Sequence, residues 1–275
     1  LSAQKKPLDQ SAYDGWKSIV SPKVSENGDW ICYAITPQRG DALLEFYNAG
    51  TKQTTRIERG GSPAWFNNDT WATFKIAVPF AKVRQAKIDK VKADKMPKDT
   101  FAVMNLAEMK VVKLPGAKEL KTSAKGALYA YTYEVTPVKD TTVKDSAAKG
   151  NKTPGKYDRL VVVDVRTGDS TVVDSVKNFT VAENGRSVLY TREADSLKAV
   201  YVYTVDPKRG VLQRELWSSK LGAVSPSLVL DRSGEQGAFL VTADTVKHAL
   251  YDLYYFSTTD LTPRQVADAQ IIGLP

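Results

Sequence analysis

The stretch that decides the fold is NGDWICYAI at residues 27–35, a polar turn that leads into a short apolar run. The same combination returns at residues 68–76 as NDTWATFKI, 41 residues further along. Asn, Gly and Asp tolerate the positive φ of a tight turn, and the run that follows has the composition of a strand. Because this turn-and-strand signal returns, the sequence predicts a repeated β unit.

The signal restarts three more times along the chain. The five restarts are residues 27–30, 68–71, 125–128, 183–186 and 231–234. In the first unit we expect four strands, at residues 31–35, 42–47, 54–57 and 62–66. The runs at residues 100–106 and 159–165 are expected to be the innermost strands of their units. Four-stranded units that repeat every ~40–50 residues are typical of a β-propeller, in which neighbouring blades bury each other's faces.

The sequence therefore predicts an all-β fold, a β-propeller of four-stranded antiparallel blades of which about five are visible. We expect residues 1–23 to form an N-terminal extension and residues 24–275 to form the propeller region. A β-sandwich or barrel with accidental similarity between hairpins is the structural alternative. Five restarts with the same order of turn and strand disfavour it.

Positive charge gathers in two insertions of the repeat, at residues 82–98 and 138–159. The chain has 39 Lys and Arg against 31 Asp and Glu, a formal net charge of +8. Residues 82–98 hold seven basic and two acidic residues, net +5, and residues 139–159 hold six and three, net +3. A nucleic-acid surface interleaves aromatic side chains with its cations, and these insertions offer only Tyr157. We interpret them as solvated lysine-rich insertions and predict no nucleic-acid partner; an acidic ligand or an anionic membrane surface is the alternative.

Helical patterns are scarce. The one weak helix candidate covers residues 82–94, inside the first insertion, and a turn or short helix is expected at residues 12–19. No window approaches the ~20 apolar residues that a membrane helix needs, so the sequence predicts no membrane span. With 42% hydrophobic and 25% charged residues, the composition is that of an ordinary globular protein.

Catalytic motifs are missing from the sequence. The nearest approach to the nucleophile elbow G-x-S-x-G is GRSVL at residues 185–189, which lacks the second glycine. His248 is the single histidine and Cys32 the single cysteine, which argues against a metal centre, a disulfide framework and a triad completed within the chain. Acidic residues stand singly, without the spacing of a general acid–base pair: Glu45, Glu58, Glu108, Glu119 and Glu134. We therefore assign no catalytic, cofactor-binding or metal-binding residue and expect this chain alone to be inactive.

Aromatic side chains are expected to pack between blades. The tryptophans occupy equivalent or nearly equivalent positions of the repeat: Trp16, Trp30, Trp65, Trp71 and Trp217. Tyr129, Tyr131 and Tyr133 alternate along one strand and therefore share one face, as do Tyr201 and Tyr203. Such a face lines a channel or lies between blades, and the second arrangement is the commoner.

Several segments resemble exported bacterial serine peptidases of the prolyl oligopeptidase family, including the dipeptidyl-peptidase and acylaminoacyl-peptidase types. The sharpest is KKPLDQSAYDGWKSI at residues 5–19, which looks like the mature N-terminus of these proteins. VSENGDWICY at residues 24–33 and VAENGRSVLY at residues 181–190 resemble the blade-opening motif of their WD-like propellers. MPKDTF at residues 96–101, after the first insertion, also looks like this group. The similarity runs along essentially the whole chain.

In that family an N-terminal seven- or eight-bladed propeller caps a C-terminal α/β-hydrolase domain, which holds the Ser, Asp and His of the triad. The resemblance implies that no triad residue maps onto this chain, because that domain is not part of it. It also implies that the visible blades are an incomplete part of such a ring, and residues 271–275 look like the approach to another blade. A closed five-bladed ring is the alternative. The dipeptidyl-peptidase branch holds a substrate amine with acidic propeller residues, and no paired glutamate here can be assigned to that role.

The resemblance therefore implies the non-catalytic propeller region of an exported serine peptidase. Such a region gates and positions short peptide substrates for a hydrolase domain beyond residue 275. Leu1-Ser2-Ala3 looks like the end of a signal peptide, so we expect a periplasmic or otherwise exported protein that is cut near Ala3. The alternative is a standalone periplasmic propeller that binds a protein or a small ligand. A third hypothesis is that the basic insertions bind an anionic polymer.

Overall fold

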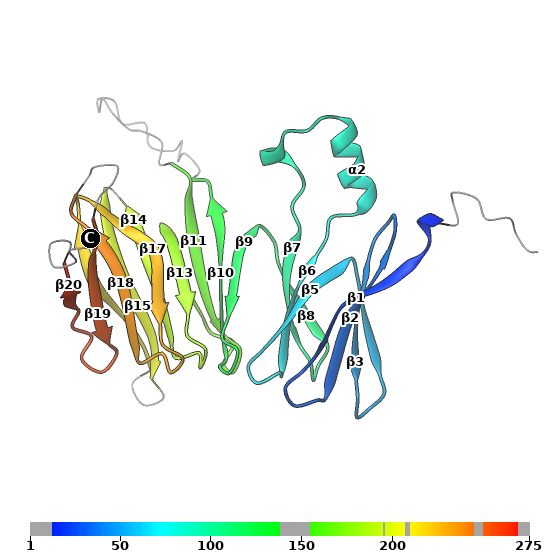
Figure 1. The fold of residues 1–275 in the computed structure, drawn as a ribbon, viewed down its shortest axis with the longest axis horizontal. Helices are drawn as coiled ribbons and strands as arrows, with labels where there is room; N and C mark the ends of the chain where they lie inside the picture. The colour runs from blue at the N-terminus through cyan, green and yellow to red at the C-terminus, as the bar shows by residue number, and fades with distance from the viewer. Residues whose placement is uncertain (1–12, 138–154, 195, 207–209, 245–249, 269–275) are drawn as a thin grey trace, which may run out of the picture. The chain divides into compact units, whose positions relative to one another are not determined.

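The computed structural model describes residues 13–137, 155–194, 196–206, 210–244 and 250–268. Within these ranges the chain forms five antiparallel sheets of four strands each (Figure 1). Each sheet is made of four strands that are consecutive in the chain, as the repeat predicts. The predicted all-β fold of four-stranded propeller blades is therefore confirmed.

The chain divides into two compact units, residues 1–116 and 117–275, and each is described by itself. The first unit holds two sheets, made of β1 (Lys17–Val24), β2 (Trp30–Pro37), β3 (Leu43–Asn48) and β4 (Thr54–Glu58), then β5 (Gly60–Phe66), β6 (Trp71–Ile76), β7 (Thr100–Asn105) and β8 (Lys110–Leu114). The second unit holds three sheets, made of β9 (Ala117–Thr122), β10 (Leu128–Val135), β11 (Tyr157–Asp164) and β12 (Ser170–Val173), then β13 (Val176–Val181), β14 (Ser187–Ala194), β15 (Leu197–Asp206) and β16 (Gly210–Ser219), then β17 (Ala223–Leu230), β18 (Gln236–Thr242), β19 (Asp252–Ser257) and β20 (Arg264–Ala267).

The sheets begin one strand earlier than the sequence predicts. β1 lies almost wholly in the stretch expected to be an N-terminal extension, residues 1–23, and pairs with β2 in a register that matches Lys17 with Pro37. Residues 62–66, expected to close the first unit, belong to β5 and open the second sheet. Every residue of β1 is exposed, so no buried apolar face marks this strand in the sequence. The boundary of the propeller region therefore moves from residue 24 to Lys17.

The five restart turns connect the first strand of each sheet to its second strand. In the first sheet the Ser25 N–H donates to the Trp30 carbonyl at 2.9 Å, and the Ala182 N–H donates to the Ser187 carbonyl at the same distance in the fourth. Positive φ values occur in four of the five restart turns: at Gly28, Gly185 and Gly234, and at Asn67, Asn68 and Asp69 of the second turn. Glycine adopts this conformation without strain, which explains why Asn-Gly and Ser-Gly pairs recur at the restarts.

A second backbone hydrogen bond recurs in all five sheets and ties the end of the third strand to the restart turn. A residue at or just after the end of the third strand donates its N–H to the carbonyl of the residue before the second strand. The five pairs are Ala49 to Asp29 at 2.8 Å, Leu106 to Thr70 at 3.1 Å, Val165 to Ala127 at 2.9 Å, Val205 to Arg186 at 2.7 Å and Thr258 to Glu235 at 2.7 Å. The repeat is thus preserved in hydrogen bonds even where an insertion lengthens the sequence.

The strands predicted to be innermost, at residues 100–106 and 159–165, are β7 and β11, which are the third strands of their sheets. The first strands are the ones that lie against the preceding sheet within each unit: β5 contacts β2 and β3, β13 contacts β9 to β11, and β17 contacts β13 to β15. β7 and β11 are strongly apolar because each has a neighbouring strand on both sides and a buried centre. The sequence alone does not distinguish such a buried strand from the innermost strand of a blade.

Apolar side chains between successive sheets form the cores. In the first unit Phe46 of the first sheet packs near Phe74 of the second, with 5.8 Å between ring centroids. In the second unit one cluster around Tyr190 joins the third and fourth sheets, and another around Phe239 joins the fourth and fifth. These side chains are at most 1% exposed, so each blade is stabilised mainly by its neighbour.

Four of the five tryptophans pack at or near these cores, and one does not. Trp30 is buried, Trp65 and Trp217 lie against the cluster edges, and Trp71 packs beside Phe66 with 6.0 Å between ring centroids. Trp16 is 54% exposed, which corrects its expected place between blades. It precedes β1 and therefore occupies no strand position in the repeat.

The first insertion contains the helix α2 (Phe80–Ile88) and the 3-10 turn η1 (Ala93–Lys95), in the connection from β6 to β7 (Figure 1). The helix thus starts earlier and ends sooner than the predicted residues 82–94. It ends where Lys90 takes a φ of 53° and the Val91 N–H donates to the Ala86 carbonyl at 2.9 Å. Of residues 12–19, only 13–14 are described as helical before β1 begins. Among the described helices none is long and apolar enough to cross a membrane.

Candidate binding rim at the insertion end of the blades

Both insertions occupy the same position of the repeat, between the second strand of a sheet and the third. The first connects β6 to β7 and the second connects β10 to β11; residues 138–154 of the second lie outside the described residues. These connections leave each sheet at the end opposite to its restart turn, because the second strand runs from one to the other. In repeat proteins such insertions lie on one face, which is often the binding face. We call this end of each sheet the insertion rim, and the rim of the second unit is the candidate functional site.

In the second unit the insertion rim carries a hydrogen-bonded group of Tyr157, Arg159 and Asp174. The Arg159 guanidinium donates from Nε to Asp174 Oδ1, and from Nη2 to Asp174 Oδ2 at 3.1 Å. The Tyr157 hydroxyl donates to Asp174 Oδ2 at 3.5 Å. Hydrogen bonding to Arg159 holds the pKa of the Asp174 carboxyl below its usual value, so this carboxylate stays ionised.

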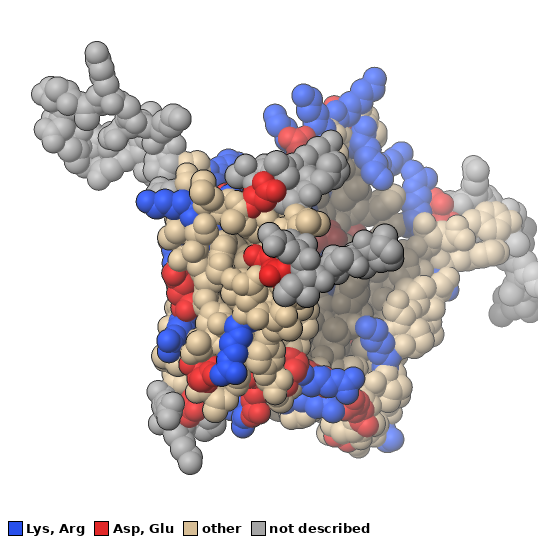
Figure 2. Space-filling model, turned by 60° about the vertical axis from the view of Figure 1, so that its left-hand side comes forward, with Lys and Arg blue, Asp and Glu red and all other residues tan. Residues whose placement is uncertain are grey.

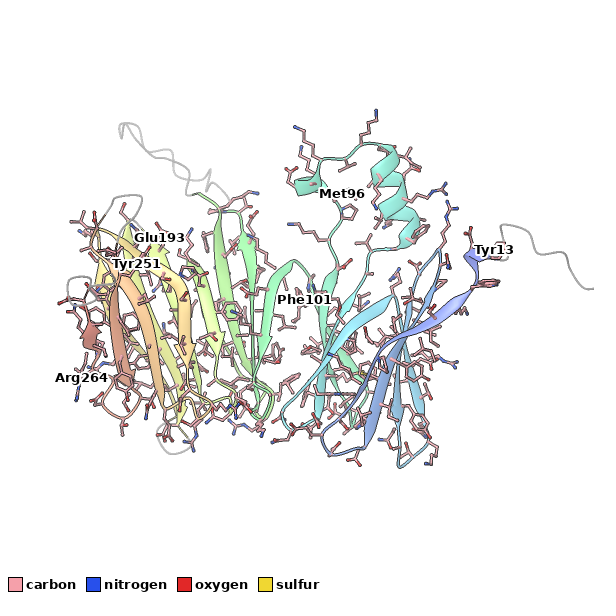
Figure 3. The ribbon with its side chains drawn as sticks, in the orientation of Figure 1. Tyr13, Met96, Phe101, Glu193, Tyr251 and Arg264 are labelled. Carbon is pink, nitrogen blue, oxygen red and sulfur yellow. The ribbon has the colours of Figure 1, made fainter. Side chains whose placement is uncertain are left out.

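Next to this group a cavity of about 100 Å³ opens at the rim. The Arg192 Nε donates to the Asp174 carbonyl oxygen at 3.0 Å, and its guanidinium lies 5.5 Å from the centre of the Tyr201 ring. Glu193 lies at the same end of β14 (Figure 3). Its carboxylate is 3.8 Å from the Lys177 ammonium. The lining residues are Lys177, Asn178, Thr191, Arg192, Glu193, Lys198, Ala223 and Val224. Three cations against one carboxylate suit a small anion such as a carboxylate group.

A second charged group stands where the second insertion leaves the third sheet. Lys118 lies 3.3 Å from Glu134 and 2.6 Å from Asp158, and Lys156 lies 2.7 Å from Glu134. The Lys156 ammonium, followed by that of Lys118, lowers the pKa of Glu134. Glu134 therefore has cationic partners on β9 and just before β11, although the sequence shows it as a single acidic residue.

Glu45, in β3 of the first unit, is a buried carboxylate. It accepts hydrogen bonds from the Tyr33 hydroxyl at 2.6 Å and from the Arg56 Nε at 2.8 Å, and it is 5% exposed. These three residues stand side by side on adjacent strands, Tyr33 opposite Glu45 and Glu45 opposite Arg56. Hydrogen bonding to Tyr33, then to Arg56, lowers the pKa of the Glu45 carboxyl.

Replacing Glu45 with glutamine should remove part of the acid sensitivity of the first unit. Because the pKa of Glu45 is lower in the folded chain, its contribution to stability is present above its ordinary value of 4.5 and is lost as the pH falls through the folded pKa. At neutral pH the variant should lose about 2 kcal/mol of unfolding free energy, the size of a hydrogen bond to a charged group. Urea unfolding from neutral to acidic pH measures both effects. Glu58→Gln, at an exposed position of β4, is the control; equal pH profiles for the two variants would contradict the prediction.

The remaining candidate groups have structural surroundings. Ser187, in the GRSVL segment, is buried and donates its hydroxyl to the Gly234 carbonyl at 2.6 Å, so it joins two restart turns and does not present a nucleophile. Cys32 is fully buried, and burial raises its pKa to about 11, which makes its thiol unreactive. His248 lies outside the described residues. The described residues hold no group of three or more His, Cys, Asp and Glu side chains placed to bind a metal ion.

Of the two tyrosine faces expected in the second unit, one lies between blades. Tyr201 and Tyr203 belong to the cluster between the third and fourth sheets, so this face lies between blades. Tyr129, Tyr131 and Tyr133 form a column on one face of β10, with successive ring centroids 6.3 and 6.2 Å apart. No rim residue was predicted from the sequence. The available signal is the alternation of Tyr157 and Arg159 along one strand.

Comparison with known proteins adds structural neighbours. No family model and no curated protein sequence matches the chain. The structure is similar to acylaminoacyl peptidase from Pyrococcus horikoshii, with a TM-score of 0.44 and 10% identity over 95% of this chain and 41% of that one. It is also similar to the β-propeller domain of the Trilobed protease from Pyrococcus furiosus, with a TM-score of 0.45 and 12% identity over 94% and 73% of the two chains. The chain thus spans about two fifths of that acylaminoacyl peptidase. The second of these neighbours is itself described as a β-propeller domain of a protease.

Proposed function

We propose that the chain is the non-catalytic propeller region of an exported serine peptidase of the prolyl oligopeptidase family. It gates and positions short peptide substrates for an α/β-hydrolase domain of the same protein. The observation that supports the proposal is where the family-like segments fall. VSENGDWICY and VAENGRSVLY span the restart turns that open the second strands of the first and fourth sheets. The segments that resemble the family's blade-opening motif therefore coincide with blade openings in this chain.

The insertion rim has the chemistry that positioning a peptide requires. Lys177, Arg192 and Lys198 line a cavity large enough for a carboxylate group, and Asp174 beside it is held ionised. Charged groups of both signs on a rigid sheet end fix the orientation of a peptide through its termini. The hydrolysis itself belongs to the proposed hydrolase domain, where a serine nucleophile forms an acyl-enzyme.

The test compares the 275-residue chain with the protein expressed from its whole reading frame. Both are incubated with a fluorophosphonate probe, which labels activated serines, and with chromogenic short peptides and a denatured protein substrate. We expect the whole protein to be labelled, to cleave short peptides and to spare the long chain, whereas the 275-residue chain does none of these. Hydrolysis by the 275-residue chain alone would overturn the proposal.

A standalone binding propeller is the second candidate, and the cationic cavity of the insertion rim favours it. The same experiment decides between the two. If the whole protein takes up no probe and its reading frame encodes no hydrolase domain, the binding module is the correct function. Export is tested separately by determining the N-terminus of the mature protein, which the proposal places close to Ala3.

A further inference from the structure

The first insertion presents an unneutralised cationic surface, which we call the basic segment (residues 80–98). Its seven Lys and Arg side chains are all exposed: Lys82, Arg84, Lys87, Lys90, Lys92, Lys95 and Lys98. Within the part of the chain that the structure describes, none of the seven is in an ion pair. Figure 2 shows Lys and Arg side chains gathered at the height of α2. The basic segment therefore exposes a concentrated positive charge to solvent.

The basic segment is held in place by the blade that it leaves and by the preceding blade. The Asp41 carboxylate accepts from the Phe80 N–H at 2.7 Å, where α2 begins. The Asp99 carboxylate accepts from the Val78 N–H at 3.0 Å, which joins the two ends of the insertion. Ala86 is the buried residue of α2, and Met96 marks the return toward β7 (Figure 3). The cations are therefore presented from an anchored loop.

Exposed apolar side chains accompany these cations. Ile88 is 60% exposed, and Phe80 and Val91 are each 37% exposed. Phe80 and Ile88 stand at the first and last positions of α2, and Val91 follows shortly after its end. Exposed apolar side chains that flank lysines and arginines can enter the interface of a bilayer to which the cations are attracted. A nucleic acid would instead stack its bases on several aromatic side chains, and Phe80 is the one aromatic residue of the basic segment.

We propose that the basic segment docks the protein on the surface of a bilayer that carries anionic headgroups. The lysines and arginines contact the headgroups, and Ile88 and Val91 enter the boundary of the acyl chains. Charge complementarity argues for this occupant, because clusters of four to eight Lys and Arg on such a segment match the field of an anionic lipid surface. The inference is independent of the peptidase proposal: a standalone propeller would bind lipid in the same way.

Vesicle flotation of the 275-residue chain tests the electrostatic part. We expect the chain to float with mixed phosphatidylglycerol and phosphatidylcholine vesicles at low salt. With pure phosphatidylcholine vesicles, or at high salt, it should remain in the bottom fraction of the gradient. The variant K82Q/R84Q/K87Q should bind about 100-fold more weakly, at about fivefold per cation. The control K52Q/K110Q/K113Q makes the same change in net charge at exposed positions outside the segment, and should bind within a few fold of wild type.

A fluorophore that reports its surroundings tests the apolar part. Ile88→Cys is labelled with nitrobenzoxadiazole, and Val112→Cys, 39% exposed in β8 before substitution, is the matched control. Cys32 is fully buried and does not compete for the label. On adding anionic vesicles we expect a blue shift and brighter emission at position 88 and no change at position 112.

Four outcomes would overturn the proposal. The first is that the chain fails to bind anionic vesicles at low salt. The second is that both triple variants lose binding equally, which would mean that binding depends on the net charge and not on the basic segment. The third is that the label at position 88 stays in water while the chain binds. Lastly, the basic segment is needed for binding heparin but vesicles do not bind, which would mean a soluble polyanion as the partner.

Discussion

Replacing Gly126 with alanine is expected to lower the unfolding free energy of the second unit by about 3 kcal/mol. An added Cβ would lie 2.0 Å from the Asn184 carbonyl oxygen and 2.4 Å from the Gly185 nitrogen. Both are backbone atoms of the restart turn of the fourth sheet, so neither moves aside by a side-chain rotation. Overpacking costs ~1–3 kcal/mol even where neighbours adjust, and this position is at the upper end.

The clash would act on the contacts that join one blade to the next. The Lys125 N–H donates to the Glu183 carbonyl at 2.8 Å, between the restart turns of the third and fourth sheets. The fourth and fifth sheets are joined in the same way, where the Asn184 N–H donates to the Arg232 carbonyl at 3.2 Å. Pushing the restart turn of the third sheet away from that of the fourth sheet therefore breaks the hydrogen bond between Lys125 and Glu183.

Gly155→Ala is the matched control for Gly126→Ala. Gly155 is also in the second unit, and an added Cβ there meets no atom within 4 Å. We expect the control to change stability by less than about 0.5 kcal/mol. Urea unfolding gives the stability, and hydrogen exchange should show lost protection in residues 123–128 and 182–187. Equal stability of the two variants, with unchanged exchange, would show that the turns do not carry the link between blades.

The restart turns were predictable because they depend on local sequence. A tight turn needs a residue that tolerates positive φ, and Gly28, Gly185 and Gly234 supply it. The second turn uses Asp69 at a φ of 60°, and its carboxylate accepts from the Glu26 N–H of the preceding turn at 2.5 Å. The sequence shows the Asp but not this bond, because the bond depends on the packing of one sheet against another.

The charged groups of the rim and core were not predictable because they depend on strand register. Arg159 and Asp174 meet because Leu160 pairs with Val173 across β11 and β12. Glu45 is flanked by Tyr33 and Arg56 for the same reason. A register shift of one residue would turn each of these side chains to the opposite face, so composition and spacing carry no record of the pairing.

Replacing Tyr190 with alanine should cost the second unit about 4 kcal/mol, the expected loss for a large buried aromatic ring. Tyr190 is fully buried between the third and fourth sheets, and its ring stacks on Tyr201 with 5.5 Å between centroids and 11° between planes. The Gln213 side-chain amide donates to its hydroxyl. Both the ring and the hydroxyl therefore have partners that alanine cannot replace.

Tyr190→Phe separates the two contributions, because it keeps the ring and removes the hydroxyl that Gln213 contacts. We expect it to cost about 1 kcal/mol, the size of one hydrogen bond. Burial raises the pKa of the Tyr190 hydroxyl, so its stabilising contribution is present below the ordinary value of 10.0 and falls as the pH rises above it. Tyr190→Phe should therefore lose stability less steeply than wild type in alkaline urea unfolding. If phenylalanine is as damaging as alanine, the loss comes from the hydroxyl contact with Gln213, within the fourth sheet, and not from the ring packed between the blades.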